Sequence, residues 1–125
     1  MATLQTARTA YARPEAPART ARAIEYDLLA RITHQLKEAW VGRAANFPRF
    51  AAALSDNQRL WSTLAADVAE PENGLPARLR AQLFYLYEFT SQHSRKVLED
   101  RAEVGVLVDI NTAVMRGLRG GEVEK

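Results

Sequence analysis

Apolar residues recur three and four positions apart along most of this chain, a spacing typical of amphipathic helices. The first regular segment starts near Arg19 and is interrupted at Gly42 and again at Asn46–Pro48. Its apolar positions are Ala21, Ile24, Leu28, Ile32, Leu36 and Ala39. The pattern therefore predicts one long amphipathic helix followed by a turn.

A second helix is predicted to begin at Ser55, after a short apolar element at Phe50–Leu54. Ser55 and Gln58 have the spacing of a capping box, in which the two side chains satisfy each other's backbone N–H groups. The helix should end before the turn-forming run Glu70–Gly74. Its apolar face consists of Leu60, Trp61, Leu64 and Val68.

Two further helices complete the pattern. Pro76 fits the first turn of the next helix, because its fixed φ suits that position and its missing N–H is not needed there. One side of this helix collects Leu79, Leu83, Leu86, Tyr87, Thr90, Ser94, Val97 and Leu98. The last helix repeats Leu107, Ile110, Asn111, Val114, Met115 and Leu118, and Gly117, Gly120 and Gly121 are expected to end it. A strand at Val104–Val108 is an alternative, but the chain offers it no partner strand.

These segments predict an all-α protein, a single-domain bundle of four to five helices with a short N-terminal helical arm. We expect the arm at residues 1–18, where Pro14 and Pro17 stop any helix, the bundle at 19–120 and a flexible tail at 121–125. The predicted core contains Ile24, Leu28, Ile32, Leu36, Leu60, Trp61, Leu64, Val68, Leu79, Leu83, Leu86, Tyr87, Leu107, Ile110, Val114 and Leu118.

One polar residue, Asn111, falls inside the apolar stripe of the last predicted helix. A buried asparagine needs hydrogen-bond partners, because leaving its amide unpaired costs free energy. We expect Asn111 to be a satisfied core residue rather than a contact to a ligand.

Composition and charge exclude several classes of function for this chain. The chain has 125 residues, no cysteine and a formal net charge of +2, which suits one domain and excludes disulfides, thiolate metal sites and thiol nucleophiles. No segment has the length and apolarity of a membrane span or a secretory signal, although residues 1–22 have the composition of an organellar transit peptide. Basic residues are scattered among acidic ones. We expect a cytoplasmic protein with no membrane partner and no direct nucleic-acid contact.

Groups that carry catalysis do not converge in this sequence. His34 and His93 lie on different predicted helices and lack the spacing of a metal site. Ser91 and Ser94 lie near His93, but neighbouring helical positions point in different directions and do not form a nucleophile with its base. We therefore expect no catalytic residue, no metal, no cofactor and no enzymatic activity.

The most informative feature is the run of residues 83–89, in which apolar side chains occupy almost every direction around the helix. Tyr85 and Phe89 lie four apart, away from the stripe that contains Leu83 and Leu86. Either this helix is central and buries both sides, or its second side binds a partner protein. The candidate partner-binding residues are Phe84, Tyr85, Phe89 and His93.

Three stretches of the chain, residues 10–36, 57–98 and 108–120, carry a family resemblance. Its densest signals are Asn57 with Arg59-Leu60-Trp61, the turn Asn73-Gly74-Leu75-Pro76, and Asn111 with Val114-Met115-Arg116-Gly117-Leu118. These segments resemble FlaF, a flagellar biosynthesis regulator of alphaproteobacteria. Residues 37–49 and 122–125 match the family less well.

The resemblance implies a cytoplasmic, non-enzymatic factor that binds flagellin, supports its synthesis and export, and works beside the companion regulator FlbT. Unpolymerised flagellin has amphipathic terminal segments, which a helical bundle with a spare apolar surface would cover in the manner of a chaperone. The alternative is a post-transcriptional regulator of flagellin messenger RNA that acts directly or through FlbT. Against direct RNA contact, the aromatic residues lie within apolar faces rather than among arginines and lysines.

Overall fold

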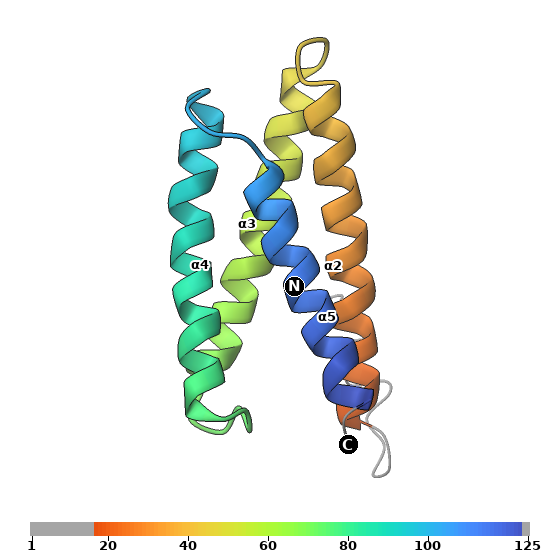
Figure 1. The fold of residues 1–125 in the computed structure, drawn as a ribbon, viewed down its shortest axis with the longest axis vertical. Helices are drawn as coiled ribbons and strands as arrows, with labels where there is room; N and C mark the ends of the chain where they lie inside the picture. The colour runs from red at the N-terminus through yellow and green to blue at the C-terminus, as the bar shows by residue number, and fades with distance from the viewer. Residues whose placement is uncertain (1–16, 124–125) are drawn as a thin grey trace.

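Four helices form an up-and-down bundle in the computed structural model, which describes residues 17–123 (Figure 1). The helices are α2 (Pro17–Val41), α3 (Phe47–Ala69), α4 (Ala77–Leu98) and α5 (Gly105–Val123). Side chains are described for residues 25–117, and the described part of the chain contains no strand. The expected all-α bundle is confirmed, with four helices.

The structure tests only part of the predictions for the N-terminal arm and for the segment before α5. Residues 1–16, most of the expected arm, lie outside the described residues, whereas Pro17 and Ala18 already belong to α2. Within the described chain, the segment Val104–Val108 leads into α5, because the Val108 N–H donates to the Val104 carbonyl at 3.2 Å. The strand alternative for this segment is therefore wrong.

The helix α3 begins directly after Asn46, and the start predicted at Ser55 is wrong. The Oδ1 atom of Asn46 accepts a hydrogen bond of 3.1 Å from the backbone N–H of Arg49. Pro48 lies in the first turn, where its missing N–H costs nothing. The helix runs through Ser55 without a break, so the short element predicted before Ser55 is the first part of α3.

The turn between α3 and α4 is built by Asn73 and Gly74. Asn73 Oδ1 accepts from the N–H of Leu75 at 3.1 Å, and Gly74 adopts a φ of 94°, which favours glycine. Pro76 is the N-cap of α4 with a ψ of 145°, so it precedes the first turn in which it was expected. The extended ψ still allows its carbonyl to accept from the Arg80 N–H at 3.0 Å.

The helix α5 runs on to Val123, so the end predicted for it at the glycines is wrong. Gly117, Gly120 and Gly121 were expected to terminate it. A glycine ends a helix when it adopts a left-handed conformation, and Gly74 is the one described glycine with a positive φ. The glycines of α5 therefore weaken this helix without stopping it.

The core consists of two apolar clusters. The larger one lies near the α2–α3 turn and joins Leu36, Ala39, Phe50, Ala53, Leu54, Val97, Val104 and Leu107. The second joins Leu29, Ile32 and Leu60, with Leu28, Val114 and Met115 packed against it. Of the predicted core residues, Ile32, Leu36, Leu60, Trp61, Val68 and Leu107 are buried. Leu28, Leu64, Leu83, Leu86, Tyr87, Ile110 and Val114 are half-buried, and the side chains of Ile24 and Leu118 lie outside the described residues.

The first half of α4 is open, which corrects the predicted core face of this helix. Leu79 is 40% exposed, whereas Val97 on the same side of α4 is 3% exposed. The reason lies in α5, which starts beside the C-terminal half of α4 and slants across the bundle toward α2 (Figure 1). The helix α5 does not reach the first turns of α4, which contact the end of α3, where Arg80 Nη1 donates to the Val68 carbonyl at 3.4 Å. Leu98, also expected on the core face, is 46% exposed because it ends α4 and points away from Val97.

Candidate partner-binding site

A network of hydrogen bonds ties α2, α3 and α5 together inside the bundle. The fully buried Asn111 accepts a hydrogen bond of 2.9 Å at Oδ1 from the indole N–H of Trp61. Its Nδ2 donates to Thr33 Oγ1 at 3.0 Å and to Asn57 Oδ1 at 2.7 Å. The Thr33 hydroxyl in turn donates to the carbonyl of Leu29 at 2.7 Å. Asn111 thus bonds to the fold itself, as expected for a core asparagine.

Sequence reasoning missed two members of this network, Thr33 and Asn57, which are both buried. A signal was present in the spacing. Thr33 follows Ile32 directly and precedes Leu36 by three positions, and Asn57 lies four positions before Trp61. Polar residues in register with an apolar stripe need buried partners, so Asn57 and Thr33 were candidates to pair with Asn111.

The four candidate partner-binding residues do not form one patch. Successive residues of a helix point about 100° apart, so Tyr85, Phe89 and His93 share one side of α4 while Phe84 faces another. Phe84 is 39% exposed and packs edge-on against Tyr87, with ring centroids 5.6 Å apart. Tyr85 is 66% exposed. The structure therefore separates Phe84 from the other three.

His93 is engaged within the fold. Its Nε2 lies 2.8 Å from the carbonyl oxygen of Glu103. Because a carbonyl oxygen only accepts hydrogen bonds, the Nε2–H group is the donor. Its ring also stacks on Phe89, with centroids 5.5 Å apart and planes at 22°. These contacts hold the α4–α5 connection against α4, exactly where α5 begins to leave that helix.

In its first half, before His93, α4 presents apolar side chains on a surface from which α5 has turned away (Figure 1). We call this surface the open face of α4. It consists of Leu79, Tyr85, Leu86 and Phe89, whose directions spread over about a third of the helix circumference, from the edge of the apolar stripe at Leu79 and Leu86 to Tyr85. Leu79 and Tyr85 are exposed, and Leu86 and Phe89 are half-buried. The face spans the eleven residues 79–89, about 15 Å of helix from first to last. It has the length and apolar character needed to receive about three turns of an amphipathic helix.

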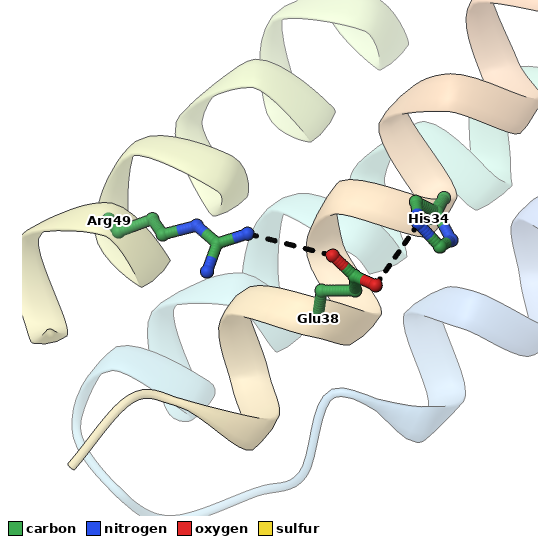
Figure 2. A network of polar contacts seen from close by, with 3 residues as sticks. All are labelled: His34, Glu38 and Arg49. Carbon is green, nitrogen blue, oxygen red and sulfur yellow. Dashed lines mark ion pairs between the residues drawn. The ribbon is translucent and has the colours of Figure 1, made fainter. Parts of the chain in front are cut away.

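Elsewhere on the described surface, charged side chains form exposed ion pairs. Glu38 lies 3.2 Å from His34 and 3.8 Å from Arg49, and these three side chains are more than half exposed (Figure 2). Such exposed pairs contribute at most about 1 kcal/mol each. Among the described residues, no group of three or more His, Asp or Glu side chains is placed to hold a metal ion. None of the described helices is both long and apolar enough to cross a membrane.

The fold and the open face define a small all-helical bundle in which one helix is left partly uncovered. The chain belongs to the FlaF family, because the family model for flagellar protein FlaF matches residues 7–118. This match includes the whole of α2, α3 and α4 and most of α5, so the protein is related to the flagellum. Comparisons with curated proteins and with solved structures found no match.

Proposed function

We propose that this FlaF-family protein is a non-enzymatic cytoplasmic regulator of flagellum biosynthesis that binds flagellin through the open face of α4. The observation that supports the proposal is the exposure of Leu79 and Tyr85, 40% and 66%, in the half of α4 that α5 leaves uncovered. An amphipathic helix of unpolymerised flagellin would cover this face as a further helix of the bundle. Binding would keep that segment from associating with other flagellin chains, which is a chaperone-like role.

The expected energetics favour such a complex. Each Å² of apolar surface that the two chains bury contributes about 25 cal/mol, and aromatic residues dominate helix-in-groove interfaces. Truncating one aromatic anchor commonly costs about 2 kcal/mol, which is roughly thirtyfold in affinity. Tyr85 is the most exposed aromatic side chain of α4 and is therefore the expected anchor.

The test compares substitutions on two sides of α4 in the full-length protein. Leu79→Ser with Tyr85→Ser changes the open face, and Phe84→Ser changes an aromatic residue of similar exposure to Leu79 on a different side. Flagellin affinity is measured by titration calorimetry, and the melting temperature is measured on the same samples. We expect the double variant to lose at least roughly thirtyfold in affinity with little change in melting. Phe84→Ser should bind flagellin as the unsubstituted chain does.

Equal affinity for all variants would contradict the proposed site, and no binding by the unsubstituted chain would contradict the proposed partner. Replacing flagellin with its transcript tests the alternative, regulation of flagellin messenger RNA by direct contact. Binding that falls steeply with added salt would support that alternative, because contacts to phosphates release counterions. Adding FlbT to the same mixtures tests whether this companion regulator joins the complex or carries the RNA effect.

A further inference from the structure

The α2–α3 connection differs from the rest of the surface in its chemistry. The tip, which we define as residues 40–48, places Val41 82% exposed and Phe47 48% exposed at the two ends of the turn. The side chains of Ala44, Ala45 and Pro48 are also exposed. Figure 1 shows this connection projecting beyond the end of α4 and the start of α5. The tip is therefore a convex apolar projection.

Aromatic rings anchor the tip to the core. Phe50 is buried, and its ring lies 5.3 Å from Trp40 and 6.0 Å from Phe47, measured between centroids. The guanidinium carbon of Arg43 lies 3.4 Å from the centre of the Trp40 ring, and Arg43 Nη1 donates to the Trp40 carbonyl at 2.8 Å. The exposed side chains of the tip are thus held on a rigid base.

The charges around the tip are mainly positive. No acidic residue occurs between Glu38 and Asp56, and Glu38 is itself paired with Arg49 (Figure 2). Arg43 belongs to the tip, and Lys37 and Arg49 lie within three residues of its ends. The opposite end of the bundle differs, because the α3–α4 connection at residues 70–76 carries two acids and no base. The α4–α5 connection at residues 99–104 carries three acids and one base. It lies at the same end of the bundle as the tip, and the tip projects beyond it (Figure 1).

We propose that the tip docks on an anionic lipid surface, with Val41 and Phe47 entering the headgroup region and the positive charges of Lys37, Arg43 and Arg49 attracting lipid phosphates. Phenylalanine and tryptophan are favoured at this boundary, and an exposed apolar side chain such as that of Val41 loses contact with water there. Each lysine or arginine near an anionic membrane adds to the attraction. This inference goes beyond flagellin binding, and it revises the expectation of no membrane partner, which rested on the lack of a spanning segment.

The shape of the tip favours lipid over a protein partner. A stable protein complex buries about 800 Å² on each side, across a broad and complementary surface. A projecting turn of a few residues offers much less contact to a folded protein. Lipid headgroups, in contrast, close around a convex tip from all sides and can cover its whole apolar surface.

The test is sedimentation of the full chain with vesicles of phosphatidylcholine alone and of phosphatidylcholine mixed with phosphatidylglycerol. We expect binding to the anionic vesicles only, weakened by added salt because exposed charges are screened. Val41→Asp with Phe47→Asp should lower the vesicle affinity tenfold or more. Phe84→Asp is the control, since Phe84 is 39% exposed in the first half of α4, away from the tip, and it should leave binding unchanged.

Two further measurements separate docking from misfolding. Lys37→Glu leaves the apolar tip intact and should still reduce binding to anionic vesicles, and Trp40 emission should shift to shorter wavelength when they are added. Trp61 is fully buried, so Trp40 dominates that change. No binding, equal binding to both kinds of vesicle, or unchanged binding by the Val41 and Phe47 variant would overturn the proposal. Capture of a flagellar protein by the tip without vesicle binding would also overturn the proposal that the tip binds lipid. None of these results would affect the proposal that α4 binds flagellin.

Discussion

The indole N–H of Trp61 donates a 2.9 Å hydrogen bond to Oδ1 of Asn111, and both side chains have no exposed surface. This bond joins α3 to α5, and the amide nitrogen of Asn111 extends it to Thr33 on α2. The network therefore fastens α5 to α2 and α3 and draws it away from α4. The open face of α4 is a consequence of that choice of partners.

Asn111→Ala should destabilise the protein by about 2 kcal/mol or more, because the buried donor of Trp61 and acceptor of Asn57 would lose their partner. Trp61→Phe should also destabilise it, since Asn111 Oδ1 then loses its donor. In the double variant the two costs should fail to add by at least about 0.5 kcal/mol, the mark of a direct contact. Urea unfolding of the four proteins measures this coupling, and strictly additive costs would contradict a shared bond.

Asn46→Ala should cost about 1 kcal/mol, because it removes the side-chain oxygen that caps α3. Ser55→Ala is the control, since Ser55 is exposed in the middle of α3 and should change the free energy of unfolding by less than about 0.5 kcal/mol. Chemical denaturation measures the free energy of unfolding of both variants. A larger loss at Ser55 than at Asn46 would restore the capping box as the true helix start.

Asp100 ends α4 in a left-handed conformation with a φ of 61°, and the Arg101 N–H bonds back to the Lys96 carbonyl at 2.8 Å. Glycine adopts this conformation without a steric penalty, and it also removes a negative charge from a helix C-terminus. Asp100→Gly should therefore stabilise the protein by up to about 1 kcal/mol. Glu99→Gly is the control and should not stabilise the protein, because Glu99 has a φ of −89°. Thermal melts of both variants test this, and a higher melting temperature for Glu99→Gly than for Asp100→Gly would contradict the left-handed conformation of Asp100.

Val97→Ala should cost about 1.5–3 kcal/mol, because this side chain is packed in the larger core cluster. Leu79→Ala removes more atoms from the same side of α4, yet it should cost less than about 1 kcal/mol, since Leu79 is 40% exposed. Guanidinium unfolding of both variants measures the difference. An equal or larger loss at Leu79 would mean that the first turns of α4 are covered in solution.

The periodicity of apolar residues was sufficient to predict the helical class, the separation of α3 from α4 and the burial of Trp61. These features depend on local geometry, because a spacing of three and four residues places side chains on one face of a helix wherever it lies. The turn at Asn73 and Gly74 is local in the same sense, since it needs only a left-handed glycine and an asparagine side chain. The need of Asn111 for buried partners also followed from its position in the stripe.

Only the tertiary structure showed which helix packs against the apolar face of each other helix. The stripe of α4 reads as continuous from Leu79 to Val97, but α5 covers just its second half, because Asn111 bonds to α2 and α3. The start of α3 at Asn46 rather than Ser55 likewise reflects packing of a long apolar face, which outweighed the local cap. A periodic pattern states which side of a helix is apolar, whereas the direction of its neighbours determines which part of that side is buried and which part remains available to a partner.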